Sequence, residues 1–469
     1  MPDGVLLTSP DPGSFRDPTN QVFHVGGEVR RGLRGAAVED WRALAATEFF
    51  GRLVEAGKIC RTEPVQPQPG WELTLRHEKI PFVSYPYEWT FSMLRDAALL
   101  HLDILAAALA ERMTTKDGSG YNLQWRGTAP VFIDVGSFER LREGEPWAGY
   151  RQFCQTMLYP LLLTAHLGVA FQPWLRAQID GIEPGQLRRL LHGRAKWKAG
   201  VLKHVRLQDA MQARLAGTSS RQMSAELKSA GFSTELVVAT VRGLAKLVRR
   251  LDWQPPASHW QGYRETCSYS DADRDAKLAF VEAALAGAGQ RELVLDLGTN
   301  DGAYARLAAR HARQVVAVES DHAVTDALYQ RLRESEQGRE RRILPLVMDL
   351  ADPSPGGGWR SVERAPFVGR TRADTVLALA LVHHLAIGRN VPLPQVVDLL
   401  ATLGREVVVE FVDPADPMAG RLLANKPAGM FGDYHRDGFE RALSERFTVV
   451  HRQQLPSGTR TLYAGVPRG

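Results

Sequence analysis

The sequence predicts an α/β domain in the C-terminal half of the chain and an α+β domain in the N-terminal half. Three observations lead to this prediction. From about residue 271, short apolar segments alternate with amphipathic helical patterns, which is typical of a parallel sheet covered by helices on both faces. The chain ends in two strand patterns around a turn, which predicts an antiparallel hairpin at the edge of that sheet. The first half mixes strands and helices without this alternation.

The C-terminal elements follow one another in a regular order. The expected strands are ELVLDLG, QVVAVES, ILPLVMDL, DTVLALAL, EVVVEFV and the two arms of FTVVHRQQLPSGTRTLYAGVP. The expected helices are AKLAFVEAALAG before the first strand, then AYARLAARHA, AVTDALYQRLRES and LPQVVDLLATL. Together they predict a seven-stranded, mostly parallel sheet with an antiparallel terminal hairpin.

The N-terminal half predicts strands, one shorter helix and one long helix. FHVGGEVRRGL and WELTLRHEKIPFVSYPYEW have extended character, VEDWRALAATEFFGRLVEAG predicts a single helix, and FSMLRDAALLHLDILAAALAERM predicts the long one. We expect an α+β domain over residues 1–180, a helical, basic connecting region over 181–270, and the α/β domain over 271–469.

Composition and length place limits on the class of protein. The chain has 469 residues, of which 44% are hydrophobic and 24% charged, and its net charge is +5. This fits a folded protein of two or three domains. We find no apolar run long enough for a membrane span and no signal-peptide pattern. The three cysteines lie far apart without metal-type spacing, so a cytoplasmic location is expected.

The first expected strand of the α/β domain ends in an unusual turn, VLDLGTNDG. Gly298 and Gly302 allow close approach of the backbone and a tight start of the next helix, and Asn300 is a residue type that tolerates a left-handed conformation. Asp296 and Asp301 put negative charge where a pyrophosphate would need a free helix N-terminus. The turn therefore favours a cationic ligand.

The next two strands add acids at their tips. Glu319 ends the second strand, where an acid can accept hydrogen bonds from both hydroxyls of a ribose. Asp349 ends the third strand, where it could accept from an adenine amino group while Leu350 covers the ring. In this order, the three strand ends resemble those of the class I S-adenosylmethionine-dependent methyltransferases. The resemblance covers about residues 270–469 and implies a Rossmann-like fold with S-adenosylmethionine as cofactor.

The alternative for this sheet is a different nucleotide-binding fold, such as that of a dehydrogenase. The turn DLGTND lacks the G-x-G-x-x-G fingerprint of dinucleotide binding, and the terminal hairpin suits the methyltransferase sheet.

Candidate catalytic residues follow the fourth and fifth strands. His383 and His384 come directly after the fourth strand, which the resemblance places beside the methyl group, and a neutral histidine could deprotonate an acceptor. We favour His384 as the base. Glu410 and Asp413 lie at the end of the fifth strand, where they could orient the acceptor or the histidine, or cap a loop. No Asn-Pro-Pro-Tyr motif is present, so the expected acceptor is an oxygen or ordinary amine of a small molecule, sugar or secondary metabolite.

The N-terminal half contains a second constellation. Asp117 and Asn122 have the D-x-x-x-x-N spacing of kinases, and Asp134 with Gly136 follows as D-x-G. This part resembles the protein-kinase and aminoglycoside-phosphotransferase fold, which implies ATP and magnesium. No histidine precedes Asp117 and no V-A-I-K lysine is visible. The residues therefore leave open a chance match, a kinase-like binding domain and an active kinase.

Three functions remain open. The main one is a methyltransferase whose kinase-like domain helps to bind the acceptor, and the second is a bifunctional kinase and methyltransferase. The third is a methyltransferase that acts on RNA through a basic stretch of residues 188–206. A solvated helix face is the preferred interpretation of that stretch, and no RNA-binding motif is recognisable, so nucleic acid is not the expected partner. Segments YPYEWTFSMLRDAALLHLDIL and FIDVGSFE, joined to a methyltransferase, resemble the bacterial nodulation-type host-specificity methyltransferases. We expect no membrane partner, and the sequence predicts no particular oligomeric state.

Overall fold

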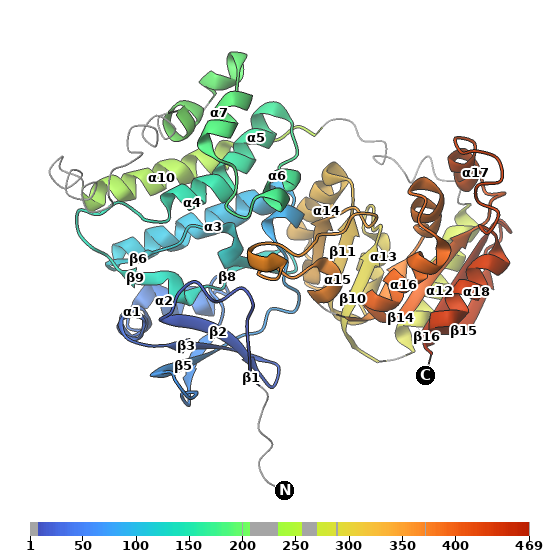
Figure 1. The fold of residues 1–469 in the computed structure, drawn as a ribbon, viewed down its shortest axis with the longest axis horizontal. Coiled ribbons are helices and arrows are strands. Elements are labelled where there is room, and N and C mark those ends of the chain that lie inside the picture. The colour runs from blue at the N-terminus through green and yellow to red at the C-terminus, as the bar shows by residue number, and fades with distance from the viewer. Residues whose placement is uncertain are drawn as a thin grey trace, which may run out of the picture. The chain divides into compact units, whose positions relative to one another are not determined.

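The structure is a computed structural model that describes residues 8–198, 200–206, 233–255, 270–287, 289–370 and 372–468. The chain divides into two compact units (Figure 1). Unit 1 comprises residues 1–125, 130–255 and 356–364, and unit 2 comprises 126–129, 256–355 and 365–469. Much of the predicted connecting region, namely 207–232 and 256–269, lies outside the described residues.

Unit 2 is built on a seven-stranded sheet in the order β12-β11-β10-β13-β14-β16-β15. Its strands are β10 (Arg291–Leu297), β11 (Ala312–Glu319), β12 (Ile343–Val347), β13 (Ala373–Ala378), β14 (Gly404–Val412), β15 (Phe447–Gln454) and β16 (Arg460–Pro467). β10 to β14 pair in parallel, and β16 pairs antiparallel with both β14 and β15. This confirms the predicted Rossmann-like sheet with its terminal hairpin. The last strand is inserted beside β14, so β15 forms the edge.

Helices connect these strands, largely as the apolar periodicity predicts. They are α12 (Asp271–Ala286), α13 (Ala303–Ala308), α14 (His322–Glu334), α15 (Phe367–Arg370), α16 (Leu393–Leu403), α17 (Pro417–Leu423) and α18 (Arg436–Arg446). α13 is shorter than the expected AYARLAARHA because β11 already begins at Ala312. α12 packs against α13, and α16 packs against α18.

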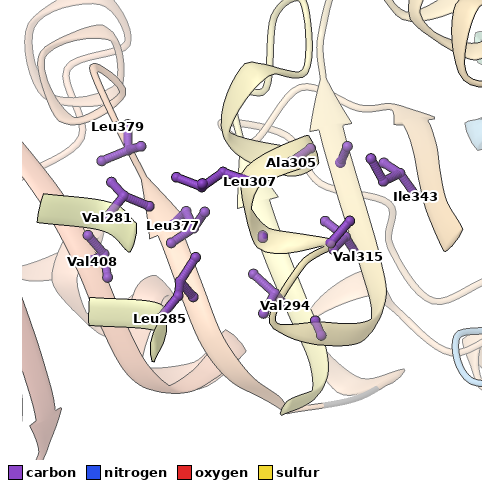
Figure 2. Packing of buried hydrophobic residues seen from close by; sticks show 14 of the residues in the cluster. Val281, Leu285, Val294, Ala305, Leu307, Val315, Ile343, Leu377, Leu379 and Val408 are labelled. Carbon is purple, nitrogen blue, oxygen red and sulfur yellow. The ribbon is translucent and has the colours of Figure 1, made fainter. Parts of the chain in front are cut away.

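Branched and small apolar side chains fill the space between the sheet and these helices. Val281 and Leu285 of α12 meet Val294 of β10 and Leu377 of β13, all buried in one cluster (Figure 2). Strands buried on both faces need such near-continuous apolar sequence. The strand order reverses between the neighbouring strands β10 and β13: from β10 the chain proceeds through β11 to β12 on one side of the sheet, and from β13 it proceeds to β14 on the other. A crevice is expected outside the carboxyl ends of the strands at this point.

Unit 1 contains a five-stranded antiparallel sheet in the order β1-β2-β3-β5-β4. Its strands are β1 (Thr8–Pro10), β2 (Asn20–Val25), β3 (Glu28–Leu33), β4 (Thr62–Val65) and β5 (Leu73–His77). The other elements of the unit are the helices α1 (Ala36–Ala45), α2 (Glu48–Glu55), α3 (Phe91–Ala110), α4 (Tyr150–Phe153), α5 (Tyr159–Leu167), α6 (Gln172–Ala177), α7 (Pro184–Leu190) and α10 (Thr234–Arg250), with the short strands β6 (Met113–Thr115), β7 (Leu123–Arg126), β8 (Ala129–Phe132) and β9 (Phe138–Arg140). β6 pairs with β9, β7 pairs with β8, and α10 packs along α3.

In unit 1 the prediction of one shorter helix is wrong, and the prediction of a kinase-like fold stays open. The single helix expected over VEDWRALAATEFFGRLVEAG is two helices, because Thr47 has an extended backbone with ψ of 146° and begins a new helix. The long helix is confirmed as α3. The structure does not show a kinase-like fold for this unit: it shows an antiparallel sheet, two short helices between β3 and β4, and the long helix.

Within the described ranges, no helix combines the length and hydropathy that crossing a bilayer requires.

Candidate functional site

Unit 2 has a cavity of about 460 Å³ at the carboxyl ends of β10 to β13. It lies where the strand order predicts a crevice. Predicted residues that line it are Asp296, Gly298, Asn300, Glu319, Asp349, Leu350 and His384. Four segments far apart in sequence therefore meet at one cavity. Four of the predicted residues, Gly302, His383, Glu410 and Asp413, are not in its lining.

The turn after β10 adopts the left-handed conformations that its sequence suggests. The φ angles of Gly298, Asn300 and Gly302 are 74°, 48° and 81°. Gly302 also needs its missing side chain, because a Cβ there would lie 2.6 Å from Leu328 of α14. Gly302 thus shapes the start of α13 from outside the cavity, while Gly298 and Asn300 form its wall.

Asp296 lies at the floor of the turn, almost completely buried. Its carboxylate accepts a hydrogen bond of 2.6 Å from the Thr299 hydroxyl. Burial raises the pKa of Asp296 to about 6, although this hydrogen bond and the charge of Lys277 work in the opposite direction. The charge of Asp296 is therefore sensitive to pH in the mildly acidic range.

Glu319 ties two turns together at the tip of β11. One of its carboxylate oxygens accepts from the backbone N–H of Asn300 at 3.0 Å. The other accepts from the N–H groups of Ser320 at 2.7 Å and Asp321 at 3.1 Å. Because the backbone holds it, the side chain stays in one position at the cavity wall.

Asp349 and Leu350 follow β12 on the same wall. Asp349 forms an ion pair with Arg389, which also lines the cavity, and accepts from the N–H of Ala351 at 2.9 Å. Leu350 is buried. The three acids at successive strand ends are thus brought together as predicted.

The two histidines have different environments. Their ring centroids lie 4.1 Å apart, but His384 faces the cavity while His383 is fully buried with no hydrogen-bond partner for either ring nitrogen. Burial lowers the pKa of both rings, and the Arg460 charge adds to the effect on His384. His384 is therefore neutral at physiological pH, as a base must be. It begins a π-helical turn, His384–Gly388.

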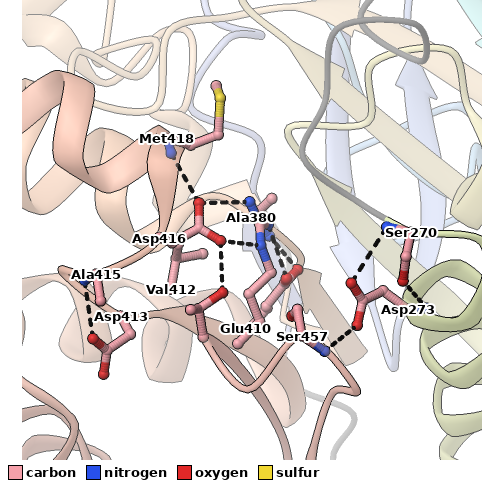
Figure 3. Close-up of polar contacts among 12 residues, drawn as sticks. Ser270, Asp273, Ala380, Glu410, Val412, Asp413, Ala415, Asp416, Met418 and Ser457 are labelled. Carbon is pink, nitrogen blue, oxygen red and sulfur yellow. Dashed lines mark hydrogen bonds and ion pairs between the residues drawn. The ribbon is translucent and has the colours of Figure 1, made fainter.

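Glu410 and Asp413 do not line the cavity, and their carboxylates bind other groups of the protein. Glu410, fully buried, accepts from Lys277 Nζ at 2.6 Å and from Arg460 at 3.2 Å. It also accepts from the N–H of Ala380 at 2.9 Å (Figure 3). Asp413 accepts from the N–H of Ala415 at 3.0 Å, which is the loop-capping role among the alternatives (Figure 3). Their catalytic roles stay predictions.

Sequence reasoning missed Lys277 and Arg460. Lys277 lines the cavity although 3% exposed, and Arg460 joins Glu410 to Asp416, which it contacts at 2.8 Å. A pattern in the sequence could have revealed the lysine. Lys277 stands three and four residues before Phe280 and Val281 on the apolar face of α12, where a charge requires a buried partner.

The kinase-like constellation in unit 1 is occupied by the protein itself. Arg31 of β3 pairs with the Asp134 carboxylate at 2.8 Å and donates to Asn20 at 2.5 Å. Burial raises the pKa of Asp117, and the nearby charge of Asp134 adds to this. Within the described ranges, no group of histidine, cysteine or acidic side chains is arranged to hold a metal ion. ATP and magnesium therefore find no support in this unit.

Comparison with known proteins identifies a relative along nearly the whole chain. Nodulation protein NoeA of Rhizobium meliloti (strain 1021) is 32% identical over 465 residues, which are 96% of this chain and 94% of the relative. The chain belongs to the NoeA family. No family model matches the chain.

Solved structures similar to this member of the NoeA family match only part of it. N-methyltransferase NodS from Bradyrhizobium japonicum WM9, in complex with S-adenosyl-L-homocysteine, is 14% identical with a TM-score of 0.32, covering 45% of this chain and 98% of NodS. Magnesium protoporphyrin IX methyltransferase from Synechocystis PCC 6803, with bound S-adenosylmethionine, is 15% identical with a TM-score of 0.31, covering 47% and 89%.

Proposed function

We propose that the chain is an S-adenosylmethionine-dependent methyltransferase that modifies a hydroxyl or amine of a small molecule, sugar or secondary metabolite. One observation carries the proposal. The strand ends of β10, β11 and β12 bring Asp296, Glu319 and Asp349 to a single cavity at the point where the strand order reverses. Sheets of this kind bind nucleotides at such a point.

The residues of the cavity fit the parts of this cofactor. Its volume of about 460 Å³ lies within the range of ordinary ligand pockets, about 300–1,000 Å³. Glu319 would bind the ribose hydroxyls, and Asp349 with Leu350 would bind the adenine. Asp296 and Asp301 supply negative charge toward the sulfonium and amino groups, while Lys277 and Arg274 supply positive charge for the carboxylate. A cofactor with both signs of charge suits a cavity lined by both.

When bound, S-adenosylmethionine supplies an electrophilic methyl group, which leaves as the carbon–sulfur bond breaks and its electron pair stays on sulfur. The protein has to bind the acceptor in line and to remove one proton from it. His384 suits the second task, because it lines the cavity and its lowered pKa leaves the ring uncharged. Tyr304 and Leu381 also line the cavity, and their apolar surfaces would help to exclude water.

Calorimetry with S-adenosylhomocysteine tests the proposal. We expect saturable binding with a dissociation constant in the micromolar range. No heat of binding at high micromolar ligand would refute the proposal.

The alternatives lack an observation of this kind. A phosphotransferase would need the Asp134 carboxylate, which Arg31 holds. An RNA substrate would need the basic stretch, of which Arg188, Arg189, Lys196, Lys198 and Lys203 are exposed. Exposed cations alone are typical of a solvated surface, so we place the acceptor among small molecules. RNA binding that falls steeply with salt and depends on these five residues would favour the third function instead.

A further inference from the structure

The backbone beside the cavity is strained at Ala380. This residue follows β13 and has a φ of 52°, a left-handed conformation that a side chain normally disfavours. Ala380 also lines the cavity. Such conformations persist only where the surroundings hold them, and they concentrate at functional sites. Some neighbouring group must therefore keep Ala380 in its left-handed conformation.

The holding group is Glu410. Its carboxylate accepts from the N–H of Ala380 at 2.9 Å (Figure 3), and the same oxygen accepts from Lys277 at 2.6 Å. The other oxygen accepts from Arg460 at 3.2 Å. Both oxygens are thus engaged, and the side chain is fully buried outside the cavity lining. Glu410 has no path to an acceptor, which separates it from His384.

The network around Glu410 is balanced in charge. Arg460 also donates to Asp416 at 2.8 and 3.1 Å. The cations Lys277 and Arg460 therefore face the two carboxylates, and all four residues are at most 3% exposed. Buried charges keep fixed positions when each has its partners, and removal of one leaves the others uncompensated. Glu410 is therefore a rigid anchor for the Ala380 N–H.

The strained residue sets the direction of the segment that follows. Leu381 and His384 both line the cavity. The carbonyl of Leu381 accepts from the N–H groups of His384 at 3.0 Å and Leu385 at 3.2 Å. The π-helical turn His384–Gly388 begins there, and such turns are frequent at functional sites. A rotation at Ala380 would move the part of the cavity wall formed by Leu381 and His384.

We infer that Glu410 is a positioning residue: it holds Ala380 in the left-handed conformation and thereby fixes the cavity wall that carries Leu381 and His384. This inference rests on the proposed function, because the wall is taken to bind S-adenosylmethionine. It assigns to Glu410 a role in orienting the site, without contact with the reacting atoms.

Rescue by glycine separates this role from a merely structural one. Glycine reaches positive φ at no steric cost, so a glycine at position 380 should need Glu410 less. We expect Glu410→Gln to weaken binding of S-adenosylhomocysteine about tenfold, since the neutral amide oxygen accepts more weakly from the Ala380 N–H and leaves Lys277 without its carboxylate partner. Glu410→Gln with Ala380→Gly should recover affinity to within about threefold of wild type. The control, Glu410→Gln with Ala415→Gly, should keep an affinity about tenfold weaker than wild type. Ala415 is exposed and does not have a positive φ, so glycine relieves no strain there.

The melting temperatures of the single variants test the inference even if Glu410→Gln does not fold. Ala380→Gly should raise Tm by about 1–2 °C by removing strain, whereas Ala415→Gly should lower it. Equal lowering by both variants would overturn the inference, as would an affinity that Ala380→Gly fails to recover in a folded Glu410→Gln protein. Failure of the wild type to bind S-adenosylhomocysteine would instead refute the proposed function, and the Tm comparison would still decide whether Ala380 is strained.

Discussion

Glu319 contacts backbone N–H groups from two different turns, through both oxygens of its carboxylate. It would therefore meet a ribose without first having to be ordered. Preorganised acids of this kind lose little side-chain entropy on binding. Its contribution to affinity should be correspondingly large.

We predict that Glu319→Ala weakens S-adenosylhomocysteine binding by roughly 1.5–3 kcal/mol, because two charge-assisted hydrogen bonds are lost. Calorimetry measures the change. Glu336→Ala, at an exposed position after α14, is the matched control and should leave affinity unchanged. Equal affinity of wild type and Glu319→Ala would show that the ribose lies elsewhere.

The two histidines should respond differently to substitution. His384→Ala should reduce turnover about a hundredfold or more with cofactor affinity nearly unchanged, as expected for loss of a general base. His383→Ala should loosen cofactor binding with a smaller effect on turnover, because it removes a buried ring behind the wall. Single-turnover rates and calorimetry separate the two. Equal, mild effects would mean that proximity alone drives the reaction.

Asp296 should make stability depend on pH in a defined direction. Its folded pKa of about 6 exceeds the ordinary value near 4, so between these pH values the folded state binds more protons than the unfolded state. Stability from this group is therefore present below about pH 4 and is lost as pH rises through about 6. Asp296→Asn should gain up to about 3 kcal/mol relative to wild type between pH 4 and pH 7. Urea unfolding at both pH values measures this, and a constant difference would contradict it.

At the scale of elements, α12 contributes more than packing. It carries Phe280, Val281 and Leu285 into the core and Lys277 into the charge network from the same face. Burial lowers the pKa of Lys277, and the nearby Glu410 charge opposes this. The helix α12 thus both covers the sheet and fixes the position of the Lys277 charge beside the cavity.

Lys277→Met should destabilise unit 2 by about 3–5 kcal/mol, because it leaves Glu410 with an uncompensated share of buried negative charge. Arg274→Met, one turn earlier on the same helix, should cost at most about 0.5 kcal/mol because the Arg274 side chain is only partly buried, with 42% of it exposed. Urea denaturation compares the two. A small effect at Lys277 would show that Arg460 alone balances Glu410.

Local sequence predicted most elements of unit 2, and the failures have local causes. The strands and α16 agree closely with their apolar patterns. α13 ends early where β11 begins, and Thr47 divides the helix expected in unit 1 into α1 and α2. Periodicity detects which face is buried, but it does not show where a cap or a following strand ends a helix.

At the scale of the whole molecule, the two units differ in whether their predicted ligand-binding residues are available to a ligand. Unit 2 brings three acids to a cavity, whereas in unit 1 Arg31 occupies the carboxylate on which the kinase-like spacing depends. A spacing match therefore did not establish a nucleotide site, and the agreement of three strand ends was the stronger observation.

We predict that S-adenosylhomocysteine raises the Tm of the full chain and that millimolar magnesium and ATP do not, because binding to the folded state alone stabilises it. Differential scanning fluorimetry provides both measurements. A magnesium-dependent rise with ATP that Asp134→Ala abolishes would contradict the second part and support a bifunctional enzyme.

The sequence alone determined the alternation of strands and helices, the left-handed turn at Asn300 and the acids at three strand ends, because each depends on residues close together in the chain. Tertiary structure decided the insertion of β16 beside β14 and the partners of Glu410. Glu410 meets Lys277, 133 residues away, and Arg460, 50 residues away. The carboxylate looks the same in sequence whether it faces an acceptor or an ion pair. Only the pairing of distant strands and helices placed two cations beside it, and the cost of leaving a buried charge unpaired made that pairing necessary.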